Sequence, residues 1–167
     1  EILCEPGRFL VADAGTLLAA GAAMAEGCKQ ENHANAGLAL GAFIGAAALE
    51  GRDKLTLALP PSLASLGSWI EQLVAESTGK HGKGALPVVD EPLGHPDEYG
   101  SDRAIVAIAT DRDAPDEARL AALEAAGYPV LRLSTRIDGL GAEFFRWEFA
   151  TAVAGAALGI NPFDEPN

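Results

Sequence analysis

The chain has 167 residues, of which 49% are hydrophobic and 22% charged, as expected for one soluble globular domain or a piece of one. Its net charge of −12 at pH 7 argues against nucleic acid and anionic membranes as partners, but it is compatible with a small anionic metabolite bound at a local site. The two cysteines, Cys4 and Cys28, are too few for a disulfide framework, so we expect reduced thiols in a cytoplasmic protein.

The first part of the chain predicts a connecting helical segment over residues 1–35. Residues 9–12 are compatible with a short strand or a loop, and Asp13 or Thr16 can cap a helix that stops near Gly27. The apolar runs 34–49 and 150–160 are shorter than the ~20 residues that cross a membrane. We therefore expect these runs to be buried helices.

The remainder, residues 36–167, alternates between helix and strand patterns. We expect helices over 36–50, 62–78, 116–126 and 143–158, and strands over 54–59, 85–89, 104–109 and 128–133. The unbroken apolar strand at 104–109 is typical of a buried parallel sheet. The fold class is therefore α/β, a parallel sheet flanked by helices on both faces.

The second of these helices carries the stretch of greatest chemical interest. Ser62 is its predicted N-cap, and one apolar stripe follows at helical spacing: Leu63, Leu66, Ile70, Leu73 and Val74. Glu76 falls on the opposite side in the last turn, just before Gly79. The negative end of the helix dipole would raise the pKa of a carboxylate there, which suits a general base. The alternative is a solvated glutamate paired with Lys80.

Three stretches of the sequence resemble signatures of a known enzyme family. The pattern Gln72-x-x-x-Glu76-Ser77-x-Gly79-Lys80 resembles the catalytic-glutamate signature of the glucose-6-phosphate isomerases. The stretch from Arg52 to Leu57 is similar to the strand that precedes the family's glutamate helix. The stretch from Gly159 to Asp164 is similar to its C-terminal Asn-x-Phe-Asp signature. The resemblance is to the short bacterial form, which in some species is fused behind a transaldolase domain.

This resemblance implies a three-layer sugar-isomerase (SIS) fold and a cofactor-free and metal-free isomerisation. Glucose 6-phosphate and fructose 6-phosphate would interconvert through an enediol, with Glu76 as the base and Gln72 holding substrate beside it. Ser77, Thr78 and Gly79 are candidate substrate-binding residues of the pocket floor, although a simple helix stop explains them equally well.

The remaining candidates are weaker. The histidines, His33, His81 and His95, are not spaced as metal ligands. His95 is an alternative candidate for the ring-opening acid. The basic stretch 79–84 lacks the spacing of a phosphate-binding loop, so a flexible basic turn is expected there.

Three departures from the family limit the inference. Nothing matches the phosphate-binding Ser/Thr loop, the ring-opening lysine would lie beyond Asn167, and Glu165 stands where the family usually has glutamine. We therefore expect the C-terminal part of an isomerase, with little activity alone. Its partners would be a sugar phosphate and either the N-terminal half of the same enzyme or further copies of the chain. The competing hypotheses are a non-catalytic SIS module that binds phosphosugars and a generic α/β scaffold.

Overall fold

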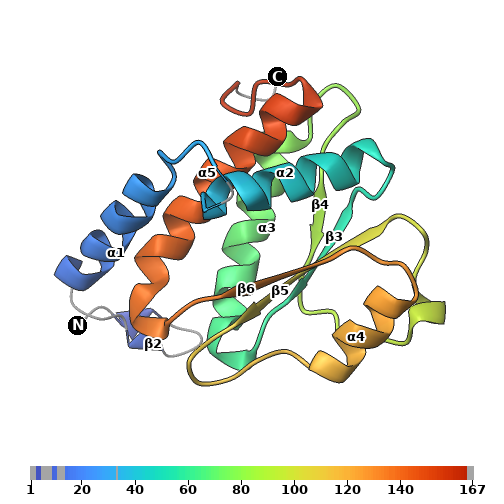
Figure 1. Ribbon diagram of the computed structural model, residues 1–167, viewed down its shortest axis with the longest axis horizontal. Coiled ribbons are helices and arrows are strands. Elements are labelled where there is room, and N and C mark those ends of the chain that lie inside the picture. The colour runs from blue at the N-terminus through green and yellow to red at the C-terminus, as the bar shows by residue number, and fades with distance from the viewer. Residues whose placement is uncertain (1–2, 5–8, 11–13, 33, 165–167) are drawn as a thin grey trace.

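The computed structural model describes residues 3–4, 9–10, 14–32 and 34–164, and Figure 1 shows the arrangement of its elements. The helices are α1 (Ala14–Gly27), α2 (Ala36–Leu49), α3 (Ala64–Thr78), α4 (Glu117–Ala125) and α5 (Leu140–Leu158). The strands are β1 (Leu3–Cys4), β2 (Phe9–Leu10), β3 (Lys54–Ala58), β4 (Leu86–Val88), β5 (Arg103–Ala109) and β6 (Val130–Ser134). Short 3₁₀ turns cover Pro61–Leu63, Pro96–Glu98 and Ile137–Gly139.

The main sheet contains four strands in the order β4-β3-β5-β6, and every neighbouring pair is parallel. Leu55 of β3 pairs with Ala104 of β5, and Ile105 of β5 pairs with Val130 of β6. The two central strands are almost entirely buried, because helices cover both faces of the sheet. The predicted α/β fold with a parallel sheet is confirmed.

Helices α2, α3 and α5 cover one face of this sheet and α4 covers the other, which gives three layers (Figure 1). The larger core joins α2, α3 and α5 to the sheet around the fully buried Trp147. The smaller core sets Leu120 and Leu123 of α4 against the opposite face. Helix α1 packs outside these layers, against α5. None of the helices in the described ranges is long and apolar enough to cross a bilayer.

Small residues allow α2 and α5 to approach closely. A side chain added to Gly41 would meet Val153 of α5 at 2.5 Å, and one added to Gly45 would meet Ala157 at 2.6 Å. The helix predicted over 36–50 is thus a core element, as expected. Cys28, next to its start, is a buried free thiol.

The helix starts agree with the predictions only in part. The Asn35 side chain caps α2 and the Asp116 side chain caps α4, each by accepting backbone N–H bonds. The prediction that Ser62 caps the helix of Glu76 is wrong, because Ser62 lies in a 3₁₀ turn and its hydroxyl donates to Asp113 instead. Thr16 lies inside α1 rather than before it, and Asp13 is outside the described residues.

Candidate functional site

Helix α3 presents Gln72 and Glu76 on its exposed face. The predicted stripe points inward: Leu63, Leu66, Ile70 and Val74 are buried, and Leu73 is half-buried. The Gln72 amide Nε2 donates a hydrogen bond of 3.3 Å to Glu76 Oε1, because residues four apart lie above one another on a helix. The carboxylate and the amide therefore form one exposed pair.

The residues after Glu76 end the helix. Thr78 is fully buried, donates from its hydroxyl to the Val74 carbonyl at 2.7 Å and accepts from the Ala85 amide at 3.0 Å. Ser77 is half-buried, and the exposed Gly79 closes the helix with an N–H bond to the Ala75 carbonyl. Among the three candidates for the pocket floor, the Thr78 hydroxyl is thus engaged in joining α3 to β4.

A tight turn follows the helix. Lys80 pairs with Lys83 in an antiparallel bridge, and His81 and Gly82 between them have φ values of 56° and 71°. Two consecutive positive φ values characterise a type I′ turn, the geometry of a two-residue hairpin loop. The basic stretch predicted to be flexible is therefore a hydrogen-bonded hairpin turn.

The two lysines of this turn reach the C-terminal end of α5. Lys83 Nζ donates to the Leu158 carbonyl at 2.7 Å, and Lys80 Nζ donates to the Pro162 carbonyl at 3.2 Å. The alternative in which Lys80 pairs with Glu76 is not observed. The two lysines instead bring the Gln72–Lys80 stretch next to the Gly159–Asp164 stretch, although about eighty residues of sequence separate them (Figure 1).

The C-terminal stretch forms a compact turn of its own. Gly159 ends α5 in a left-handed conformation with φ of 66°, and Asn161 bonds to Asp164 and to the Phe163 amide. Pro162 packs onto Gly155, where an added side chain would approach its ring to 2.7 Å. Glu165, which stands where the resembled family usually has glutamine, lies outside the described residues.

The Arg52–Leu57 stretch, the third with the family resemblance, contributes contacts that stabilise the sheet. Arg52 donates to the Arg103 carbonyl, and Lys54 forms an ion pair with Asp102, which raises the pKa of Lys54 and lowers the pKa of Asp102 through their hydrogen bond. These contacts join the entry of β3 to that of β5.

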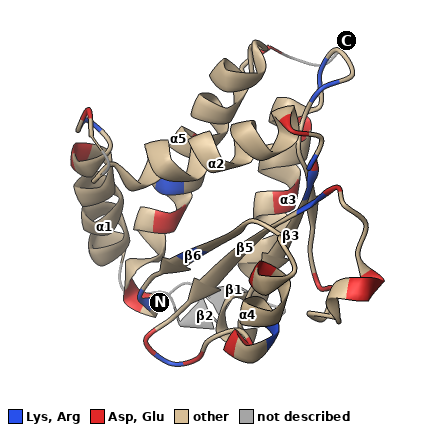
Figure 2. Ribbon diagram, turned by 45° about the vertical axis from the view of Figure 1, so that its right-hand side comes forward, with Lys and Arg blue, Asp and Glu red and all other residues tan. Residues whose placement is uncertain are grey.

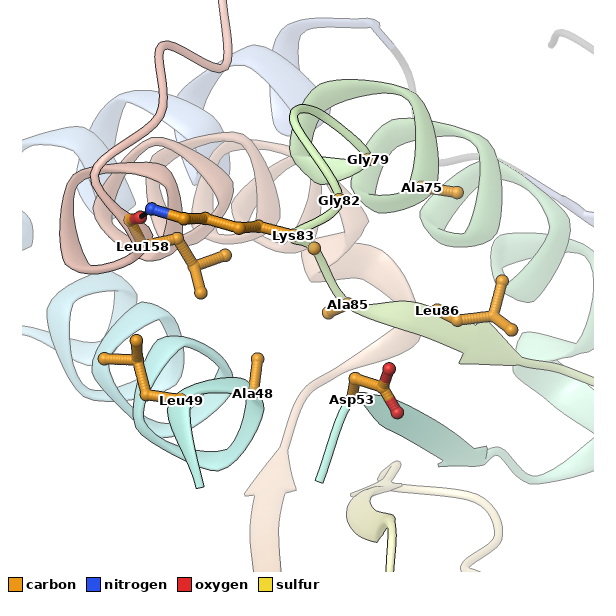
Figure 3. Close-up of a pocket in the computed structure, with 11 residues that line it drawn as sticks. Ala48, Leu49, Asp53, Ala75, Gly79, Gly82, Lys83, Ala85, Leu86 and Leu158 are labelled. Atoms are coloured by element: carbon orange, nitrogen blue, oxygen red, sulfur yellow. Dashed lines mark hydrogen bonds between the residues drawn. The ribbon is translucent and has the colours of Figure 1, made fainter. Parts of the chain in front are cut away.

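Two hollows lie at opposite ends of the sheet. The first, of about 400 Å³, lies beside the end of α3 and is lined by Asp53, Gly79, Lys83 and Leu158, among others (Figure 3). The second, of about 310 Å³, lies past the carboxyl end of β3, where the chain order reverses and open α/β sheets commonly bind ligands. Asp90, Glu91 and Asp116 line it, so it is a poor site for a phosphate.

The structure describes two of the three histidines. His95 is exposed, caps the 3₁₀ turn Pro96–Glu98 through its side chain and lies 3.1 Å from an Asp97 oxygen. His81 lies in the lysine-bearing turn, and His33 is outside the described residues. No group of three metal-ligating side chains occurs in the part of the chain that the structure describes.

Sequence reasoning missed two polar features. Asp113 accepts from Ser62 and Thr110 and so joins two loops at the carboxyl end of the sheet. Glu143 is fully buried in α5 with Arg146 Nη1 at 3.2 Å. The sequence shows that Glu143 and Arg146 are three residues apart, but it does not show that the pair is buried.

The fold and the exposed pair define a three-layer α/β protein with a carboxylate and an amide at the end of one helix. A glucose-6-phosphate isomerase from Leptospira interrogans is 28% identical in an alignment that covers 64% of this chain and 33% of that protein. The chain thus spans about a third of the length of this curated relative. A hypothetical protein of known structure from Thermus thermophilus matches with a TM-score of 0.78 and 18% identity, over 93% of this chain and 48% of that one. No model of a known protein family matches.

Proposed function

We propose that this chain is part of a sugar-phosphate aldose–ketose isomerase that interconverts glucose 6-phosphate and fructose 6-phosphate, with a fold of the SIS type. Glu76 is the base that moves the proton, and Gln72 orients the substrate beside it. The observation that carries the proposal is the contact from Lys80 to Pro162, which sets the helix end of Glu76 against the Asn161–Asp164 turn. The similarity to the Leptospira enzyme supports the same conclusion.

The reaction requires one carboxylate above two neighbouring carbon atoms. The Glu76 carboxylate takes the C2 proton of the open-chain aldose, the C1–C2 bond becomes double, and O1 takes up a proton as the enediol forms. The same carboxyl group then returns its proton to C1 while O2 loses a proton and becomes the ketone. C1 is reduced and C2 is oxidised, so no external oxidant or cofactor is needed.

The Gln72–Glu76 pair must be shielded from solvent for this reaction, and the described residues do not shield it. Glu76 and Gln72 are both exposed, whereas a base that returns a proton to substrate must be kept from water. The chain spans about a third of its curated relative. We propose that another part of the same enzyme, or a second copy, closes the site and contributes the phosphate ligands and the ring-opening group. A preceding transaldolase domain, as in the fused bacterial form, is one arrangement compatible with this.

The decisive experiment follows proton transfer directly. Fructose 6-phosphate is incubated in D₂O with this chain and with any longer natural protein that contains it, and deuterium at C1 is followed by NMR. We expect Glu76→Gln to lower the exchange and isomerisation rates by roughly 10²–10⁴-fold, the usual contribution of a general base. Glu71→Gln, an exposed glutamate on the same helix, is the matched control and should leave both rates unchanged.

Retained activity in Glu76→Gln would refute the assigned base, and no activity in either wild-type protein would refute the isomerase itself. The competing hypothesis, a non-catalytic module that binds phosphosugars, predicts a different pattern. In that case wild type and Glu76→Gln bind fructose 6-phosphate equally, and neither exchanges deuterium.

A further inference from the structure

Three helices end around the 400 Å³ hollow. Its lining includes Leu49 at the end of α2, Gly79 after α3 and Leu158 at the end of α5. The last carbonyls of a helix lack intrahelical partners and carry negative partial charge. Lys83 extends across this hollow to the Leu158 carbonyl (Figure 3), so its ammonium group lies at the negative end of the α5 dipole.

The turn geometry sends both lysines to the same side. Lys80 and Lys83 are the paired positions on either side of the two-residue loop, and paired residues of a hairpin project their side chains to one face. Lys83 therefore donates to the last carbonyl of α5, and Lys80 donates to the Pro162 carbonyl four residues later. Figure 2 shows basic residues on the turn beside the C-terminal end of the chain.

The base of this turn is fixed to α3. The Lys80 amide donates to the Thr78 carbonyl at 2.7 Å, and the Ala85 amide donates to the Thr78 hydroxyl at 3.0 Å. Gly84 has φ of 137°, and a side chain there would meet the Thr78 carbonyl at 2.8 Å. Because the turn cannot shift without breaking these contacts, its lysines hold the C-terminal segment in a fixed position relative to α3.

We propose that Lys80 and Lys83 are positioning residues of the isomerase site. They hold the Asn161–Asp164 turn in a fixed position relative to the end of α3. Glu76 lies at this end of the helix, four residues before Lys80. This inference rests on the proposed function. It also explains why Lys80 does not neutralise Glu76, since its ammonium group is engaged by Pro162. Positioning of this kind acts on the transition state more than on substrate binding, because a shift of about 1 Å can cost about 10²-fold in rate.

The test measures kcat and KM separately in the active wild-type protein and in Lys83→Met and Lys80→Met, which keep the apolar stems and lose the ammonium groups. We expect kcat to fall by roughly 10–100-fold while KM changes by less than about twofold. Lys83→Arg should recover most of the rate, because a guanidinium group can also donate to the Leu158 carbonyl. Lys29→Met, which removes an exposed lysine paired with Glu26, is the matched control.

A variant can lose activity because it does not fold or because the Asn161–Asp164 turn is misplaced. Circular dichroism shows whether the variant is folded, and titration with fructose 6-phosphate counts its functional binding sites. If Lys83→Met does not fold, Lys80→Met decides the question. Unchanged kcat in a folded variant, a rise in KM alone, or no recovery in Lys83→Arg would overturn the positioning role while leaving the isomerase intact. A wild-type protein without isomerase activity would overturn both proposals.

Discussion

The hydroxyl of Ser62 donates a hydrogen bond to the carboxylate of Asp113, and this contact joins the loop before α3 to the loop after β5. The Ser62 amide adds a bond of 3.1 Å to the second oxygen, and the Thr110 hydroxyl donates to the first at 2.6 Å. Three donors on one carboxylate hold the start of the helix whose far end carries Glu76. These hydrogen bonds are strongest when Asp113 is ionised, so the ionised form stabilises this position of the helix start.

The first prediction concerns the pH dependence of this loop contact. The hydrogen bonds from Ser62, and then from Thr110, hold the pKa of Asp113 below its usual value. Because the native pKa is lower than that of the unfolded chain, about 3.9, the stabilisation is present above that pH and is lost as the pH falls through the native pKa. Asp113→Asn should melt below wild type at pH 7, and the difference should shrink below about pH 4. Glu71→Gln, at an exposed glutamate, is the control.

The second prediction tests the close approach of α2 and α5. In Gly41→Ala the new methyl group would collide with the Ala150 carbonyl and with Val153, and overpacking of this kind usually costs about 1–3 kcal/mol. Gly27→Ala, at the last residue of α1, places its methyl group where no other atom lies within 4 Å. It should gain about 0.4–1 kcal/mol, because alanine reduces the conformational entropy of the unfolded chain. Urea unfolding of the two variants measures both effects. Equal stability of the two would contradict the packing described here.

The third prediction separates the structural and substrate-binding interpretations of Thr78. Thr78→Val removes the acceptor of the buried Ala85 amide, so the free energy of unfolding should fall by about 1–3 kcal/mol. Thr78→Ser keeps the hydroxyl and should lose less. If Thr78 instead binds substrate in the assembled enzyme, Thr78→Val will raise KM in protein that is still fully folded.

The fourth prediction concerns the buried pair of Glu143 and Arg146 in α5. Replacing Arg146 alone by Met leaves a buried carboxylate without its cation and should cost about 3–5 kcal/mol. The double variant Glu143→Leu with Arg146→Met removes both charges and should recover most of that loss. Calorimetry of Arg146→Met, Glu143→Leu and the double variant measures the coupling.

The same pair makes a prediction about pH. Burial raises the pKa of Glu143, and Arg146 opposes this effect. The native state therefore binds this proton more tightly than the unfolded chain does, whose glutamate pKa is about 4.3. The resulting contribution favours folding below that pH and is lost as the pH rises through the native pKa. The double variant should lack this component of the stability profile.

The sequence alone predicted the features that follow from the repeat of hydrophobic residues along a helix or a strand. The apolar stripe from Leu63 to Val74 determines which face of α3 is buried, and that leaves Gln72 and Glu76 together on the outside. The buried strand at 104–109 predicted the central β5 for the same kind of reason, since a parallel sheet is covered on both faces. The roles of Gln72 and Glu76 in catalysis stay predictions.

Tertiary packing decided which polar groups find each other. Ser62 has the local signal of a helix cap, yet Asp113, 51 residues away, takes its hydroxyl. Lys80 is spaced to pair with Glu76, yet the fold places Pro162, 82 residues away, within its reach. Residue spacing along a helix fixes only which side chains are neighbours on that helix, whereas a hydrogen bond forms with whichever partner the packed chain brings within about 3 Å. That partner depends on how the helices and the sheet assemble, which no local pattern specifies.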